Sequence, residues 1–351
     1  MKNISIYFTS ILLLLLITHT SAAMAEGSSS SDNRIVQSAL SGIKVTGGIS
    51  AGYFYASNPG EDTSGDQFLL SNLLVEFSSA DEDLPMGFVG ALGRTSTPSI
   101  LDAPENNTDL MIEYASLAMK PLEGLGIEAG LLQPNAGFEN TYTYNNNNIF
   151  FGAVASQQPY NAYGARLDYD IDEFSFSGGY YMQRLDDEEY NSPDYAWEIG
   201  VSAAISDNDL SVYNYHIAGK RNLLGAVIER TIEGVYLAFN IDYWTLDDDA
   251  NEPAAGDSSI GAAFYICPSL GSISVPVRLE YINQDTSGIY IEDRSAKGIY
   301  AATLSPTYHF FENAYIRAES AYVKADSGFS DQDGHRRDSR IDLAVEIGFL
   351  F

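Results

Sequence analysis

The charged side chains with the clearest chemical pattern are basic–acidic pairs whose members lie two residues apart. The three pairs are Arg166 with Asp168, Arg278 with Glu280, and Arg317 with Glu319. Alternate side chains of a β-strand point to the same face, so each pair would share one face of a strand. There the two charges can form a local ion pair, or they can act on solutes through their electric field. Asp242 lies on another segment of the same pattern, whereas Glu139, Asn145 and Asn146 lie in a longer polar stretch.

Residues suited to metal binding or covalent catalysis are few. Beyond residue 25, histidine occurs only at His216, His309 and His335, and none has the spacing of a metal motif. The single cysteine, Cys267, excludes an intramolecular disulfide and a cysteine metal cluster. Residues 331–334 are similar to the start of a calcium loop but lack its later Glu. The sequence therefore predicts no enzyme, no cofactor and no metal site, with a hydrolase assembled from distant segments as the open alternative.

The composition is strongly acidic, with a formal net charge of −30. This balance argues against binding to nucleic acid, which requires clusters of Lys and Arg. It also argues against an anionic substrate held on a basic surface. Hydrophobic residues make up 45% of the chain, with 24 Tyr and 17 Phe, so the acidity does not indicate disorder.

The first residues have the pattern of a secretory signal peptide. Lys2 precedes an apolar run at residues 11–17, and Ala23-Met24-Ala25 is a small-x-small cleavage site. The run is shorter than the ~20 residues that a membrane-spanning helix needs. We expect residues 1–25 to be removed, residues 26–42 to form a polar linker, and residues 43–351 to form a single domain.

From residue 43 onward, segments of alternating polarity are separated by turn residues, as in a transmembrane β-barrel. We count about sixteen segments, an even number as in bacterial barrels. They are residues 43–55, 67–79, 86–94, 109–120, 124–132, 161–170, 173–183, 195–205, 209–219, 223–232, 234–246, 258–267, 272–283, 297–310, 313–325 and 339–351. The predicted fold is an all-β antiparallel up-and-down barrel.

The connections between these segments alternate in length. One set is short, such as residues 121–123 and 171–172, and would face the periplasm. The other set would be extracellular and is longer, except for residues 220–222. The longest connection is the third of this set, residues 133–160.

The two faces of the predicted strands differ in polarity. In the last segment Ile341, Leu343, Val345, Ile347 and Phe349 share one face, whereas Asp342 and Glu346 lie on the other. A basic residue on the lipid face near mid-bilayer would cost about 2–4 kcal/mol, which the apolar face avoids. A barrel of this size holds water, so the inward charges are expected to be solvated.

The pattern resembles Gram-negative outer-membrane porins. The terminal strand, with Phe349 and Phe351, is similar to the signal that such proteins present to the barrel-assembly machinery. More narrowly, residues 126–132, 136–140 and 158–167 resemble the OmpL-like family of β-barrel porins. The resemblance implies an outer-membrane location, contact with lipid and lipopolysaccharide, and passage of ions and small hydrophilic solutes. It is also compatible with a homotrimer.

The resemblance further implies that the third loop folds into the lumen and narrows the pore. Glu139 would supply charge there, Asn145 and Asn146 would supply hydrogen-bonding groups, and residues 149–151 could anchor the loop to the wall. Glu139 opposite Arg166, Arg278 and Arg317 would create a transverse field, although local pairing of these arginines is equally compatible with the sequence. We expect the pore to favour cations or neutral solutes.

Two further interpretations stay open. A structural or adhesive barrel with a plugged lumen would have the same strand pattern, and so would a substrate-specific channel. Acidic runs at residues 186–189 and 247–249 could bind divalent cations that bridge to lipopolysaccharide, but a solvated loop is the simpler interpretation.

Overall fold

The computed structural model describes residues 42–60, 64–79, 85–96, 98–102, 109–183, 194–247, 257–284, 289–290, 297–331 and 333–351. The expected signal peptide, almost all of the expected linker and the acidic run at residues 186–189 lie outside these residues. None of the helices in the described part of the chain is long and apolar enough to cross a membrane.

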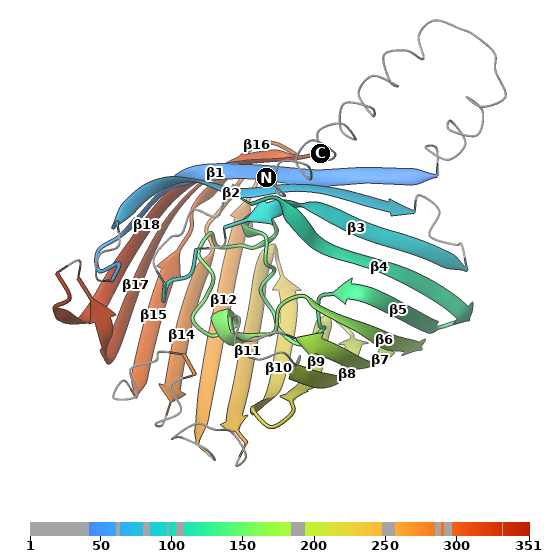
Figure 1. The fold of residues 1–351 in the computed structure, drawn as a ribbon. Helices are drawn as coiled ribbons and strands as arrows, with labels where there is room; N and C mark the ends of the chain where they lie inside the picture. The colour runs from blue at the N-terminus through green and yellow to red at the C-terminus, as the bar shows by residue number, and fades with distance from the viewer. Residues whose placement is uncertain are drawn as a thin grey trace, which may run out of the picture. The chain divides into compact units, whose positions relative to one another are not determined.

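Within these residues, eighteen β-strand segments form one antiparallel sheet (Figure 1). Their bounds are β1 (Ile43–Ala56), β2 (Asp66–Ser79), β3 (Met86–Thr95), β4 (Met111–Leu122), β5 (Leu125–Leu132), β6 (Ala162–Ile171), β7 (Phe174–Gln183), β8 (Asp194–Ile205), β9 (Asn208–Ile217), β10 (Arg221–Ile232), β11 (Val235–Leu246), β12 (Ser258–Leu270), β13 (Ile273–Ser274), β14 (Val277–Gln284), β15 (Gly298–Leu304), β16 (Thr307–Phe311), β17 (Ala314–Ser330) and β18 (Arg336–Leu350). Two short 3₁₀ helices, η1 (Thr143–Asn145) and η2 (Ala155–Gln157), lie between β5 and β6.

The eighteen segments make sixteen barrel strands, which confirms the predicted number. Two strands are each interrupted once, between β13 and β14 at Pro276 and between β15 and β16 at Pro306. Proline has no N–H group to donate to the ladder, so each proline divides one strand into two segments.

The ring closes because β1 pairs with β18 as well as with β2. Nine residue pairs join β1 to β18, from Gly48 opposite Leu350 to Ala56 opposite Asp342. Beyond them, Gly47 and Phe351 exchange two backbone hydrogen bonds, of 2.9 and 3.0 Å. Closure leaves no unpaired strand edge, which is what a β-structure in lipid requires.

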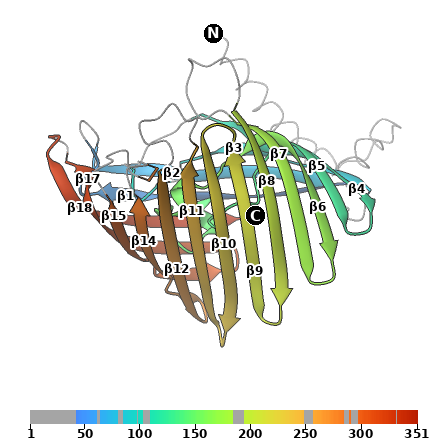
Figure 2. The same cartoon turned by 90° about the horizontal axis from the view of Figure 1, so that it is seen from below.

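The short turns lie along one edge of the ring (Figure 2). Asp172, Ser206 and Glu233 have positive φ values of 51°, 57° and 49° in the turns that follow β6, β8 and β10. Two-residue turns of this kind match the right-handed twist of the flanking strands. The predicted alternation of short turns with longer loops is confirmed.

The two faces of β18 differ in exposure as the sequence predicts. Ile341, Leu343, Val345, Ile347 and Phe349 are each between 43% and 55% exposed. Asp342 and Glu346 are 0% exposed and point inward. The outer face is therefore apolar, and the acidic residues face the lumen.

The last hairpin is longer than predicted. β17 continues to Ser330 and β18 begins at Arg336, whereas alternation in the sequence ends at residue 325 and resumes at residue 339. The added part is mostly polar, and the register shifts between Lys324 and Phe329. Backbone pairing, the buried Phe329 side chain and the Asp331–Arg337 ion pair hold it, and these contacts produce no period-two hydrophobic pattern.

The Phe351 ring packs over Gly47 at the seam between the first and last strands, where a Cβ atom on Gly47 would lie 2.8 Å from the ring, so replacing Phe351 by alanine should impair barrel assembly. The matched control is Phe311→Ala, because Phe311 is also an exposed aromatic residue (68%, against 51% for Phe351) at the periplasmic end of its strand. Heat-modifiable mobility of outer-membrane fractions should show less folded barrel for Phe351→Ala than for the control. Equal amounts of folded barrel would contradict the assigned role.

Candidate functional site

The third loop, residues 133–160, lies inside the ring of strands, where Figure 1 shows it in green. Its side chains and backbone make hydrogen bonds to inward-facing residues of β2, β8, β11, β14, β17 and β18. The loop therefore reaches walls on different sides of the lumen.

Buried carboxylates of the wall bind backbone amides of the loop. The Glu319 carboxylate accepts hydrogen bonds from the N–H groups of Ile149 and Phe150, the latter at 3.0 Å. Glu280 accepts one from Val154 at 3.0 Å, and Glu198 accepts one from Asn135 at 2.9 Å. Hydrogen bonds to a charged acceptor are about twice as strong as neutral ones. These three carboxylates fix the loop from β17, β14 and β8.

Glu346 and Asp242 hold two further parts of the loop. The Thr143 hydroxyl donates to Glu346 at 2.8 Å, and the Gln158 amide donates to Asp242 at 2.7 Å. Tyr144 packs on the wall where β1 has Gly48; a Cβ atom at this position would lie 2.8 Å from the ring. A glycine is therefore required for this contact.

Apolar residues complete the attachment of the loop. Ile149, Phe150 and Phe151 are buried, with exposed fractions of 0%, 1% and 4%. The Phe150 ring meets Phe54 of β1 edge-on, with centroids 5.9 Å apart. The expectation that residues 149–151 anchor the loop to the inner wall is confirmed.

Arg278 is the cation at the centre of the attachment. Its guanidinium lies 2.7 Å from Glu139 of the loop and 2.9 Å from Glu280 of its own strand, and it also donates to the Phe150 carbonyl at 2.9 Å. Gly152 permits this approach, because a Cβ atom there would lie 2.7 Å from Glu280 and 3.0 Å from Glu139. Arg278 therefore pairs with Glu280 of its own strand and also contacts Glu139 of the loop.

Arg166 and Arg317 are placed differently. Arg166 pairs with Asp168 at 3.0 Å and with Glu128 at 2.7 Å, and it donates to the Gln133 carbonyl at the start of the loop. Arg317 donates to Thr307 and to the Thr143 carbonyl, and its guanidinium lies 4.8 Å from the centre of the Tyr315 ring. Of the three arginines, Arg278 is the one that contacts Glu139.

The expectation that the inward charges are solvated is wrong for most of the wall. Asp242, Arg278, Asp342 and Glu346 are each 0% exposed, because protein atoms, many of them from the third loop, cover them. A buried carboxylate needs donors in place of water. Backbone N–H, hydroxyl and amide groups supply them here.

Two cavities border the tip of the loop. The larger has a volume of about 490 Å³ and is bordered by β1–β6 residues that include Glu76, Glu128 and Arg166. The smaller has a volume of about 230 Å³ and is bordered by Glu139 of the loop and Glu229 of β10. Asn145 lines both. The loop thus narrows the lumen and leaves space on two sides of its tip.

Comparison with known families decides the nature of this barrel. A family model described as "Putative beta-barrel porin-2, OmpL-like" matches residues 42–351. The chain belongs to this family of β-barrel porins. It is a channel protein of the outer membrane of Gram-negative bacteria. A search of curated protein sequences found no match.

Three solved structures illustrate the similarity of the fold. OmpT of Vibrio cholerae superposes with a TM-score of 0.62 and 12% identity, covering 88% of this chain and 97% of that one. The outer membrane channel DcaP of Acinetobacter baumannii gives 0.56 and 13%, covering 88% and 97%. An anion-selective porin from Comamonas acidovorans gives 0.57 and 10%, covering 88% and 99%. At these identities the likeness concerns the fold.

The sequence-predicted site residues of the porin fall into two groups. Glu139, Asn145, Asn146 and Arg166 border the two cavities. The others do not border these two cavities and instead contact the loop or a neighbouring charge: Asp168, Asp242, Arg278, Glu280, Arg317 and Glu319.

Sequence analysis missed several contacts within the porin lumen. Part of the second extracellular loop lies against the third, with Ser99 bridged to Phe151, and Arg340 donates to the Leu101 carbonyl at 3.3 Å. Glu113 is the extra residue of a β-bulge in β4, opposite the step from Ala91 to Leu92, which turns its side chain inward. Arg340 and Asp342 lie two residues apart, so the period-two pattern predicts that their side chains point to the same face. The bulge at Glu113 interrupts this pattern, so the pattern does not predict the face to which the Glu113 side chain points.

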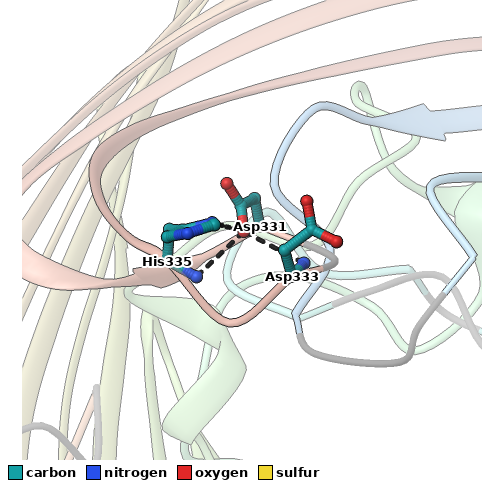
Figure 3. A group of neighbouring side chains, drawn as sticks. All are labelled: Asp331, Asp333 and His335. Carbon is teal, nitrogen blue, oxygen red and sulfur yellow. Dashed lines mark hydrogen bonds and ion pairs between the residues drawn. The ribbon is translucent and has the colours of Figure 1, made fainter.

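Asp331, Asp333 and His335 of the last extracellular hairpin place possible metal-ligand atoms within 4.8 Å of one another (Figure 3). The Asp331 carboxylate already accepts the backbone N–H groups of His335 at 2.9 Å and Asp333 at 3.0 Å, and it pairs with Arg337. The hydrogen bond from the His335 N–H, and then the one from the Arg337 side chain, lower the Asp331 pKa to about 2. These contacts describe a turn that the carboxylate stabilises, so we assign no metal to it.

Removing the charge of Glu319 should loosen the loop, because the Ile149 and Phe150 amides lose a charged acceptor worth about 1.5–3 kcal/mol. Hydrogen–deuterium exchange of peptides covering residues 145–152 should therefore be faster in Glu319→Gln. Glu76→Gln is the control, since Glu76 accepts hydrogen bonds from Thr46 and Tyr114 of the wall. Unchanged exchange in Glu319→Gln would exclude this attachment.

Proposed function

We propose that this porin is a passive diffusion channel that favours cations and neutral hydrophilic solutes over anions. The observation that carries the proposal is the excess of acidic groups in and around the lumen. Glu76, Glu128, Glu139 and Glu229 border the two cavities, against Arg166 alone. Arg166 is itself paired with two carboxylates.

The buried charged side chains show the same excess of acidic groups. Among the described residues, seven buried side chains are acidic and four are arginines. Fixed charges of one sign along a narrow path raise the local concentration of ions of the opposite sign. The charge of −30 for the whole chain acts in the same direction.

The proposal involves no chemical reaction. Solutes would pass through the spaces beside the loop tip, where Asn145 and its neighbours offer uncharged hydrogen-bonding groups. Glu139 and Arg278 would stiffen the narrow region through their 2.7 Å ion pair.

Assembly and export complete the proposal. A homotrimer is supported by the trimer form of the structurally similar Vibrio cholerae OmpT. Residues 1–25 would direct export, the barrel-assembly machinery would insert the barrel through a signal that includes Phe349 and Phe351, and lipid and lipopolysaccharide would surround it.

A plugged structural barrel is the second candidate, because protein atoms of the third loop bury much of the inner wall. Liposome swelling with small neutral sugars separates the two candidates. The channel proposal expects swelling at a rate that falls as sugar size rises. Liposomes that stay unswollen with every sugar would support the plugged barrel instead.

Neutralising one carboxylate in each cavity should weaken cation preference. In planar bilayers with a KCl gradient, the reversal potential of the native porin should have the sign of K⁺ selectivity, and the Glu76→Gln, Glu229→Gln double variant should move towards zero. Glu173→Gln is a control that removes one charge from an exposed periplasmic turn. A native reversal potential of the opposite sign would refute the cation bias.

A further inference from the structure

We infer that the cavity of about 230 Å³ between the third loop and strands β9–β12 is a binding site for a small organic ammonium cation. The inference rests on the proposed channel function and names a solute class for one part of the path. The cavity is smaller than the roughly 300–1,000 Å³ of sites for drug-sized ligands, so its ligand is small.

The charges around this cavity favour a cation. Its lining contains Glu139 and Glu229 and neither lysine nor arginine. Arg278 contacts Glu139 at 2.7 Å from outside the lining, but Glu280 shares the same guanidinium at 2.9 Å. One arginine therefore serves two carboxylates, and Glu229 adds a further negative charge. Next to protein atoms the effective dielectric constant is lower than in bulk water, so this excess attracts a cation more strongly than it would in bulk water.

Aromatic rings favour an organic cation over a metal ion. Phe138, Tyr236 and Tyr265 line the cavity, and the Phe138 and Tyr265 ring centres are 4.7 Å apart. The Tyr236 hydroxyl donates to Glu229 at 2.5 Å, and the Tyr265 hydroxyl donates to Glu139 at 2.9 Å. Each tyrosine ring is thereby fixed next to a carboxylate. Ring faces attract quaternary and other ammonium groups through their quadrupole.

The loop tip supplies uncharged acceptors. Asn145 and Asn147 line the cavity and are exposed, whereas Asn148 is buried and donates to Ser305 at 2.5 Å. Their amide oxygens can accept hydrogen bonds from an ammonium or hydroxyl group of the solute.

The neighbouring cavity of about 490 Å³ lacks this combination. It also has tyrosines and carboxylates, but Arg166 is part of its lining. Arg166 would meet a bound solute directly, whereas Arg278 lies outside the lining of the smaller cavity, so the ammonium site is assigned to the smaller cavity. The two cavities therefore provide a comparison within one molecule.

The test uses the full-length porin in planar bilayers, with choline chloride added to a constant KCl solution. Choline should reduce the K⁺ current in a saturable manner, and 3,3-dimethyl-1-butanol, a neutral molecule of the same shape, should not. Glu229→Gln should weaken the block about tenfold, the size expected from losing a charge contact or a desolvated cation–π contact. Tyr236→Leu should also weaken the choline block while the channel still conducts K⁺.

Glu76→Gln is the matched control, because Glu76, like Glu229, is a lumen carboxylate that accepts a tyrosine hydroxyl, but it lines the larger cavity. Its choline block should stay within about twofold of the native value, well below a tenfold change of 1.4 kcal/mol. An equal loss of block in both variants, or equal block by the neutral molecule, would overturn the site. A K⁺ current that choline does not affect would overturn the site and leave the channel function standing.

If the bilayers show no K⁺ current, the channel function fails, and calorimetric titration of the detergent-solubilised porin with choline then tests the site alone. Saturable heat that Glu229→Gln removes would support it. No saturable heat would reject it.

Discussion

The structure depends on the hydrogen bonds between buried carboxylates of the barrel wall and the backbone of the third loop. Glu319 of β17 and Glu280 of β14 lie on one part of the ring and Glu198 of β8 on another, and each accepts at least one N–H group of the loop. An inward carboxylate without donors would be costly once covered, and a loop with free N–H groups would be equally costly in a narrow lumen. The loop N–H groups satisfy the wall carboxylates and the carboxylates satisfy the N–H groups, so the wall and the loop together stabilise a single position of the loop.

This mode of attachment has an electrostatic consequence. Amide and hydroxyl groups act as donors to several of these carboxylates where no arginine does, and acidic side chains outnumber basic ones in the described part of the covered wall. Arg278 likewise forms ion pairs with two carboxylates, those of Glu139 and Glu280. In the proposed function, the groups that hold the loop would therefore also supply the negative field that favours cations.

The barrel could be predicted from the sequence because its main constraint is repeated along the chain. Period-two alternation gave nearly all strand bounds, and it placed Asp342 and Glu346 inward and Phe349 outward. Alternation fails where side chains do not decide the structure: at the breaks next to Pro276 and Pro306, at the bulge that contains Glu113, and in the polar extension of β17 and β18. The inward-facing charged residues could be named from the sequence, but their contacts could not. The partners of Glu319 are backbone amides, and any residue other than proline carries one.

The central claim is that the third loop is fixed against the lumen wall while solutes pass beside it. Asn148 of the loop and Ser305 of the wall have side-chain atoms 2.5 Å apart. In a Cys267→Ser background, cysteines at both positions should form a disulfide under mild oxidation in assembled outer membranes. The cross-linked porin should retain its unitary conductance, since its loop is already in place. Failure of this pair to cross-link in folded barrels, or loss of current when it does, would contradict the account.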